Sequence, residues 1–283
     1  MAEELRHILT IDVEDWYLAH LEFFPESPAS LRDPPDASVI SSVQKFLDLL
    51  DETHNSATFF VLGTVASHFP DLVREIVARG HEVGSHGHLH RRLHHLMPEE
   101  FKNDLEQSLE VLHKAGAPRI KGYRAPCFSI TGRTLWALDV IKSCGLEYDS
   151  SIFPVRRRLY GIPGWPRHAH QCANGLWEFP PGTIHALGMN LPVAGGGYLR
   201  MLPYSLVAAG VRNRTLSTPA VFYLHPYELY PEGAQMRHRP RRAYSKAVAI
   251  LERMNLKKNP KKIRRLLTEF RFDRLDKHLP SAG

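Results

Sequence analysis

Short apolar runs alternate with amphipathic helical patterns through the first half of the chain. Runs rich in β-branched and aromatic residues predict strands over residues 7–12, 57–63, 82–85 and 120–124. Between them, apolar residues recur at helical spacing and predict helices around residues 39–50 and over residues 70–79, 98–116 and 131–144. Repeated strand–helix units of this length predict a parallel sheet covered by helices, either a barrel or a doubly wound sheet.

The pattern changes after residue 153. Prolines and glycines are frequent over residues 153–219, but aromatic and apolar residues are too numerous for a disordered linker, so we expect a turn-rich insertion that shapes a surface. Residues 221–224 return to a strand pattern. Residues 237–283 carry apolar residues at helical spacing, which predicts a pair of amphipathic helices. We therefore divide the chain into an α/β domain, residues 1–236, and a helical extension, residues 237–283.

The composition of the 283-residue chain is that of a globular protein, with 43% hydrophobic and 23% charged residues. No apolar run approaches the roughly 20 residues that span a bilayer, and the acidic start of the chain does not resemble a secretory signal. The three cysteines are odd in number and widely spaced, which argues against a disulfide framework and against a CxxC zinc site. We therefore expect a cytoplasmic protein without a transmembrane segment.

The net charge of +6 is unevenly distributed along the chain. Residues 237–283 contain 15 lysines and arginines against 4 acidic residues, so the rest of the chain is mildly acidic. Such a basic segment could contact nucleic acid, anionic lipid or an acidic partner. We favour the simpler interpretation that the lysines and arginines form the solvated face of the two helices. Nucleic acid is not an expected partner.

Chemically capable side chains follow several of the predicted strands. In parallel α/β sheets, ligands bind at the carboxyl ends of the strands, where such side chains would converge. The residues at these strand ends are Asp12, Glu14, Asp15, His86, Arg124, Asp149 and His225.

The clearest local signal is the segment from Ser85 to His90, in which His86 and His90 are four residues apart. One helical turn would direct both imidazoles at one point, which is a spacing found in metal sites. A carboxylate from the first strand could complete a two-histidine, one-carboxylate site. A histidine-rich stretch can also be a solvated loop, but the acidic cluster at a neighbouring strand end favours the metal site.

These residues belong to motifs that occur in a recognisable order. They read Thr-Ile-Asp-Val-Glu-Asp-Trp at 10–16, Ser-His-Gly-His-Leu-His at 85–90, Tyr-Arg-Ala-Pro at 123–126, Tyr-Asp-Ser-Ser at 148–151 and Tyr-Leu-His-Pro at 223–226. Over roughly residues 7–272 the chain resembles the polysaccharide deacetylases of the NodB-homology type, carbohydrate esterase family 4. The Asp-Val-Glu-Asp-Trp variant, with residues 176–180 and 192–200, resembles the branch found at exosortase loci, which has a C-terminal extension.

The resemblance implies a distorted (β/α) barrel of about seven parallel strands that removes an N-acetyl group from a sugar. It also implies a divalent metal, with zinc expected and cobalt, nickel or manganese as alternatives. By motif, Asp12 would be the general base and His225 the general acid. His86 and His90 would bind the metal together with one carboxylate.

Two further roles and one open choice follow from the same motifs. Arg124 would pair with Asp12 and hold it ionised, and Asp149 would orient His225. The family motif has two adjacent acids, base then ligand, whereas Val13 intervenes here, so either Glu14 or Asp15 could be the metal ligand. Strand alternation places Glu14 on the side of Asp12. We favour Asp15, because it corresponds chemically to the family's acid and begins the loop, and Glu14 stays open.

The leading hypothesis is a metal-dependent N-deacetylase whose partner is an N-acetylated sugar, glycan or glycan precursor. One alternative on the same fold is hydrolysis of a C–N bond in a small amide or cyclic imide. Another is a catalytically silent glycan-binding protein that contacts a glycan-assembly complex through its basic extension. A complete set of Asp12, His86, His90 and His225 favours an enzyme, because a silent protein has no chemical need for it. The oligomeric state is left open.

Overall fold

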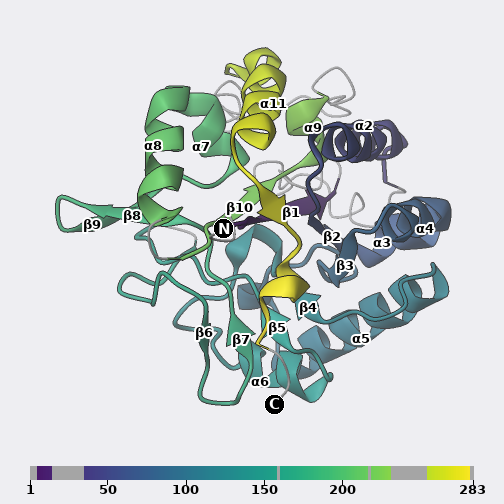
Figure 1. The fold of residues 1–283 in the computed structure, drawn as a ribbon. Helices are drawn as coiled ribbons and strands as arrows, with labels where there is room; N and C mark the ends of the chain where they lie inside the picture. Colours follow the sequence, from purple (N-terminus) through teal and green to yellow (C-terminus); the bar gives the residue numbers. More distant parts are fainter. Residues whose placement is uncertain (1–4, 15–34, 158–159, 216–217, 231–253, 281–283) are drawn as a thin grey trace, which may run out of the picture.

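A curled sheet lies at the centre of the molecule, with helices around it (Figure 1). The structure is a computed structural model that describes residues 5–14, 35–157, 160–215, 218–230 and 254–280. Within these residues, seven strands of the sheet form one continuous parallel row. In spatial order they are β10 (Val221–Leu224), β1 (His7–Val13), β2 (Thr58–Val61), β3 (Glu82–Ser85), β4 (Gly122–Tyr123), β5 (Tyr148–Asp149) and β7 (Trp177–Glu178).

The row of parallel strands curls until its two ends meet. Pro181, just after β7, forms a parallel bridge with Val221 of β10. The short β6 (His170–Gln171) pairs antiparallel with β7 outside this row. The predicted distorted barrel of about seven parallel strands is therefore confirmed.

Amphipathic helices cover the outside of the parallel strands. They are α2 (Ser38–Thr53), α3 (Gly63–His68), α4 (Pro70–Ala78), α5 (Pro98–Lys114) and α6 (Ala137–Ser143). Proline occupies the first turn of α4 and of α5, where its missing N–H would be unbonded in any case. The buried stripe of α2 contains the apolar residues that predicted it, such as Val43 and Phe46.

The helix predicted over residues 131–144 begins later than expected, at Ala137. Thr134 explains the difference, because its hydroxyl accepts the Thr131 N–H at 2.8 Å and donates to the Ser129 carbonyl at 2.9 Å. Such side-chain bonds to the backbone compete with helix formation. This part of the prediction was wrong.

The turn-rich segment 153–219 contains more regular structure than the sequence pattern suggests. It supplies β7 to the curled sheet, followed by the hairpin β8 (Thr183–Ala186) and β9 (Met189–Pro192). Helices α7 (Gly196–Met201) and α8 (Tyr204–Thr215) then lead back towards β10. The expected insertion is therefore partly a component of the barrel itself.

The C-terminal segment packs against the amino ends of the central strands. Its elements are η6 (Leu256–Lys258), α11 (Asn259–Glu269), β11 (Phe272–Asp273) and η7 (Leu275–His278). β11 pairs parallel with the start of β1, and the side chains of Phe272 and Leu275 are fully buried. The proposed boundary at residue 236 and most of the first predicted tail helix lie outside the described residues. Among the helices that the structure describes, none is both long and apolar enough to cross a membrane.

Candidate active site

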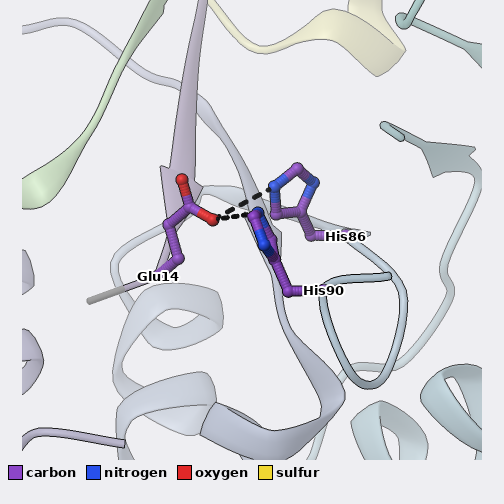
Figure 2. A group of neighbouring side chains, drawn as sticks. All are labelled: Glu14, His86 and His90. Atoms are coloured by element: carbon purple, nitrogen blue, oxygen red, sulfur yellow. Dashed lines mark ion pairs between the residues drawn. The ribbon is translucent and has the colours of Figure 1, made fainter. Parts of the chain in front are cut away.

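Three potential metal ligands converge at the carboxyl ends of β1 and β3 (Figure 2). Glu14 Oε2 lies 2.5 Å from His90 Nε2 and 3.6 Å from His86 Nε2. All three side chains are buried, and one ligand atom from each lies within 4.8 Å of the others. Two imidazoles and a carboxylate form a donor set typical of catalytic divalent metal sites.

The imidazole of His86 is already oriented for such a role. Its Nδ1 lies 2.8 Å from the carbonyl oxygen of Arg124, so Nδ1–H donates there and Nε2 faces Glu14. A second hydrogen bond of this kind is common for metal-binding histidines. Burial alone would raise the pKa of Glu14, but His90, His225 and His86 together hold it well below its usual value. The residues present therefore fit a divalent cation.

Asp15, the carboxylate expected from the sequence to be the ligand, lies outside the described residues. Glu14, the alternative, is the carboxylate found beside the two histidines. Strand alternation along β1 favours this outcome, because Asp12 and Glu14 fall on the same side of the strand.

The segment that carries the two histidines is a loop, so the predicted helical turn was wrong. Gly87 and His90 both have positive φ, 78° and 55°, which a right-handed helix excludes. The buried carboxylate of Asp104 on α5 fixes the loop by accepting the backbone N–H groups of His88 at 2.8 Å and Leu89 at 3.2 Å. Asp104 was not identified from the sequence, since nothing local marks it among the acidic residues of that helix.

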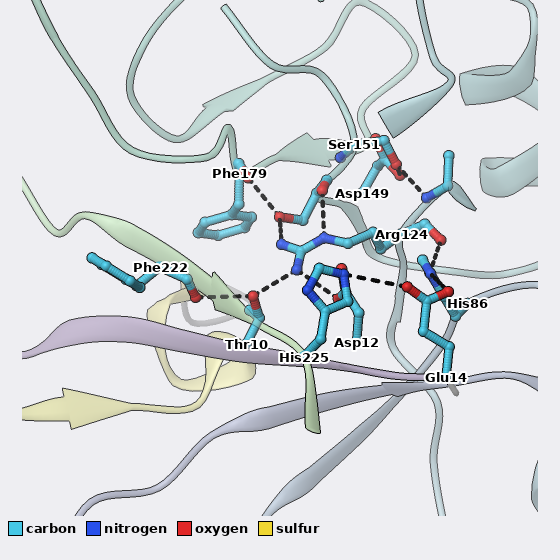
Figure 3. A network of polar contacts seen from close by, with 12 residues as sticks. Thr10, Asp12, Glu14, His86, Arg124, Asp149, Ser151, Phe179, Phe222 and His225 are labelled. Atoms are coloured by element: carbon cyan, nitrogen blue, oxygen red, sulfur yellow. Dashed lines mark hydrogen bonds and ion pairs between the residues drawn. The ribbon is translucent and has the colours of Figure 1, made fainter. Parts of the chain in front are cut away.

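Arg124 lies close to the three potential metal ligands and pairs with Asp12, as predicted (Figure 3). Its Nη1 donates to Asp12 Oδ1 at 2.9 Å and to the Thr10 hydroxyl at 2.6 Å. Nε and Nη2 donate to the carbonyl and the hydroxyl of Ser150. The guanidinium is completely buried, and the ring of Phe60 lies 4.5 Å from it. A buried cation with its donors occupied in this way holds the neighbouring carboxylate in a single position.

His225 approaches the group from the end of β10. Its Nε2 lies 3.2 Å from Glu14 Oε1, and its ring stacks on Tyr227 with centroids 5.0 Å apart. Glu228 holds the residue in place by accepting its backbone N–H at 2.8 Å, with the same oxygen 3.5 Å from Nδ1. Burial lowers the pKa of His225, but Glu14 and Glu228 outweigh it and raise the pKa well above its usual value.

The expected role of Asp149 in orienting His225 was wrong, because Glu228 is the carboxylate at that imidazole. Asp149 instead accepts the N–H and the hydroxyl of Ser151, at 3.0 and 2.6 Å. Glu228 could have been found from the sequence, since Pro226 and Glu228 follow His225 in the pattern of a helix start with a capping box.

Asp149 faces a second carboxylate, that of Glu178, across the paired strands β5 and β7. Both side chains are completely buried. Burial and the neighbouring Asp149 raise the pKa of Glu178 well above its usual value. The Ser151 hydroxyl, which Asp149 fixes, accepts the Ala125 N–H at 2.7 Å, so the pair also holds the loop that begins at Arg124.

Two family models match different parts of the chain. The model of the polysaccharide deacetylases matches residues 36–148, and that of a domain of unknown function (DUF3473) matches residues 150–280. The first match includes His86, His90 and Arg124, and the second includes Glu178 and His225. Membership of the exosortase-locus branch stays a prediction.

Curated relatives are similar to this chain over part of its length. The chain is 32% identical over 181 residues to a peptidoglycan-N-acetylglucosamine deacetylase of Bacillus cereus, which covers 59% of this chain and 62% of the relative. It is 30% identical over 147 residues to a chitooligosaccharide deacetylase of Bradyrhizobium sp., which covers 52% of this chain and 64% of the relative. The chain thus spans less than two thirds of the length of either relative.

The fold is similar to that of a solved structure over nearly its full length. A protein of Mycobacterium smegmatis assigned as a polysaccharide deacetylase superposes with a TM-score of 0.56 and 18% sequence identity. The superposition covers 95% of this chain and 92% of that one. At this identity the likeness concerns the fold alone.

Proposed function

We propose that this chain, which contains a polysaccharide deacetylase domain of carbohydrate esterase family 4, removes the N-acetyl group from an amino sugar in a glycan or glycan precursor. The products are acetate and a free amine. The observation that carries the proposal is the buried group of Glu14, His86 and His90, with Asp12 and His225 beside it. The deacetylase relatives from Bacillus cereus and Bradyrhizobium support the same substrate class.

Glu14, His86 and His90 would hold a divalent metal, for which zinc is the expected ion and cobalt, nickel or manganese are alternatives. When bound there, the metal would supply Lewis acidity towards the acetyl carbonyl and lower the pKa of a water molecule. Asp15 is the competing ligand from the sequence analysis. We propose Glu14 in its place because its carboxylate already contacts both imidazoles.

The protein's own groups would move the protons of the reaction. Arg124 occupies Oδ1 of Asp12, so Oδ2 takes the proton of the attacking water. His225 donates a proton to the sugar nitrogen as the C–N bond breaks, because the amine must leave as a neutral group. Glu228 holds His225 in the orientation for this transfer. Water and amide are thereby converted into acetate and amine, with protons balanced.

The first experiment is to measure acetate release by the purified chain from N-acetylated oligosaccharides and nucleotide sugars. We expect activity that is lost after chelation, restored by zinc, and reduced at least a hundredfold in Asp12→Asn. Acetate release that survives both chelation and Asp12→Asn would contradict the proposed mechanism. Stoichiometric zinc binding without any acetate release would instead favour a small amide as the substrate.

The choice between the two carboxylates is tested by metal binding alone. Glu14→Gln and Asp15→Asn remove one charge each at neighbouring positions, so they are matched variants. We expect Glu14→Gln to weaken zinc affinity by at least a hundredfold and Asp15→Asn to change it less than threefold. The reverse order would assign the ligand to Asp15.

A further inference from the structure

A basic pocket opens on the same rim of the barrel as the candidate active site. We use this name for the pocket of about 580 Å³ lined by His94, Thr131, Arg133, Arg157 and Tyr160 together with two glycines. His94 follows β3, Thr131 and Arg133 follow β4, and Arg157 and Tyr160 follow β5. All three loops leave the carboxyl ends of their strands, as do the loops that carry His90 and Arg124.

Phe128 contacts both Arg124, which binds Asp12, and Tyr160 of the basic pocket. The ring of Phe128 lies 5.5 Å from the guanidinium of Arg124, and its centroid lies 6.2 Å from that of Tyr160. A sugar chain whose acetamido group reaches Asp12 can therefore extend a neighbouring substituent towards the basic pocket. Its position suits a subsite for the part of the substrate next to the reacting sugar.

The charge of the basic pocket is not neutralised by its walls. No carboxylate is among the lining residues, and within the described part of the chain the exposed Arg133 has no hydrogen-bond or ion-pair partner. Arg157 lies beside the hydroxyls of Tyr198 and Tyr160, which are 3.1 Å apart. Burial raises the pKa of Tyr160, so this phenol brings no negative charge to the guanidinium. The two hydroxyls orient the guanidinium and leave its charge available.

His94, a wall residue of the basic pocket, lies in a positive field. Burial lowers its pKa, and the positive charges of His95 and Arg92 lower it further. An anion in the basic pocket would oppose this effect. The titration of the His94 imidazole is therefore expected to change when an anion binds in the basic pocket.

We infer that the basic pocket binds an anionic group of the substrate, a phosphate or a carboxylate, carried next to the N-acetylated sugar. Guanidinium groups match both anions, because their N–H donors pair with two oxygens at once. The inference rests on the proposed deacetylase function and deepens it, since it makes the substrate an acidic glycan or a phosphate-linked precursor.

Direct binding tests the basic pocket without any reference to catalysis. The probes are inorganic pyrophosphate and glucuronate, added to the zinc-loaded chain and followed by calorimetry and by the NMR signal of His94. We expect the double variant Arg133→Gln/Arg157→Gln to weaken binding of at least one probe about tenfold. Arg133→Gln alone should weaken it about threefold, and this exposed change leaves the fold intact. Binding should also weaken as salt increases.

The control variant is Arg119→Gln, which also removes one exposed positive charge. Arg119 precedes β4, at the opposite end of the sheet, and pairs with Glu147. We expect it to bind both probes like the unmodified chain. Unchanged binding in the double variant, an equal loss in Arg119→Gln, or no binding of either probe would overturn the inference.

Kinetics then connect the basic pocket to the substrate. Triacetylchitotriose is compared with the same trisaccharide bearing a reducing-end pyrophosphate and with one bearing a neighbouring uronic acid. We expect the double variant to raise KM about tenfold for the preferred anionic substrate, with kcat unchanged and the neutral substrate unaffected. The substrate that responds identifies the anion as phosphate or carboxylate. Equal KM values for all three substrates in both proteins would overturn the inference.

The two hypotheses fail in different ways. Arginine-dependent probe binding without acetate release from any substrate would overturn the proposed function and leave the anion site in place. Acetate release without arginine-dependent probe binding would overturn the anion site and leave the proposed function in place.

Discussion

The main-chain oxygen of Arg124 lies 2.8 Å from Nδ1 of His86. The side chain of the same arginine donates to Asp12 Oδ1 at 2.9 Å (Figure 3). One residue therefore positions the proposed base through its guanidinium and a proposed metal ligand through its backbone. The two contacts can be separated by mutation, because a substitution changes only the side chain.

We expect Arg124→Lys to lower kcat/KM at least a hundredfold while changing zinc affinity less than threefold. A lysine keeps the charge, but its donors all radiate from one nitrogen and cannot reproduce the four bonds that the planar guanidinium makes to Asp12, Thr10 and Ser150. The carbonyl that orients His86 remains. Acetate assays and zinc titrations on the same preparation measure both effects. A parallel loss of zinc affinity would show that the backbone contact depends on the side chain.

Removing the positive charge of Arg124 should also lower the stability of the folded protein. Arg124→Met leaves the buried Asp12 without its cation and is expected to lower the free energy of unfolding by about 3 kcal/mol at neutral pH. Asp12→Asn/Arg124→Met should recover part of this loss, because no buried charge is then unpaired. Urea unfolding of the two variants provides the comparison. Equal losses in both would argue against a charge origin.

Much of the barrel was predictable from the sequence, because strands β1 to β4 and β10 and helices α2, α4 and α5 follow from local patterns of apolar residues. The convergence of Asp12, His86, Arg124 and His225 was also predictable, since parallel strands place their carboxyl ends at one rim. The loop over residues 86–90 was not, because Asp104, from a helix later in the chain, fixes its conformation.

Long-range partners account for the other differences. Asp149 was assigned to His225, but its partner Glu178 is set by strand pairing within a segment whose sequence looks irregular. The two-residue strand β11 is too short to give a periodic signal. It forms because its backbone pairs with the start of β1. Such contacts depend on the assembled fold and on no property of the local sequence.

Gly196 gives a prediction about the proposed acid. A Cβ at this position would lie 1.7 Å from a carboxylate oxygen of Glu228, so Gly196→Ala must displace the side chain that holds His225. We expect kcat to fall at least tenfold with little change in KM. Gly197→Ala is the matched control, because a Cβ there meets no atom within 4 Å. Equal activities of the two variants would argue against the role of Glu228.

The raised pKa of Glu178 predicts that this carboxyl carries a proton beside Asp149, and a pair of substitutions tests the prediction. Glu178→Gln keeps a donor for Asp149 and an acceptor for the Ile152 N–H, so we expect a stability change within about 1 kcal/mol. Glu178→Ala removes both and leaves a cavity, with an expected loss of about 3 kcal/mol. Urea unfolding at pH 7 measures both. If Glu178→Gln lowers the free energy of unfolding as much as Glu178→Ala does, the carboxyl of Glu178 is ionised in the folded protein.

Glu82 should make stability depend on pH at the opposite end of the barrel. It accepts hydrogen bonds from the Thr58 and Tyr148 hydroxyls and from the Asp276 N–H. Burial and the nearby Asp276 carboxylate raise its pKa from 4.5 to about 7. Between these values the folded protein holds a proton that the unfolded chain releases. The contribution of Glu82 to stability is therefore largest below pH 4.5 and is lost as pH rises through 7.

We expect this loss to amount to about 2 to 3 kcal/mol between pH 5 and pH 8. Glu82→Gln is neutral at both pH values. Between pH 5 and pH 8 its free energy of unfolding should therefore fall by about 2 to 3 kcal/mol less than that of the unmodified chain. Glu106→Gln, at an exposed position on α5, should keep the pH dependence of the unmodified chain. Urea unfolding at the two pH values measures all three proteins. If Glu82→Gln shows the same pH dependence as Glu106→Gln, then Glu82 is ionised throughout the interval, and its three donors compensate for its burial.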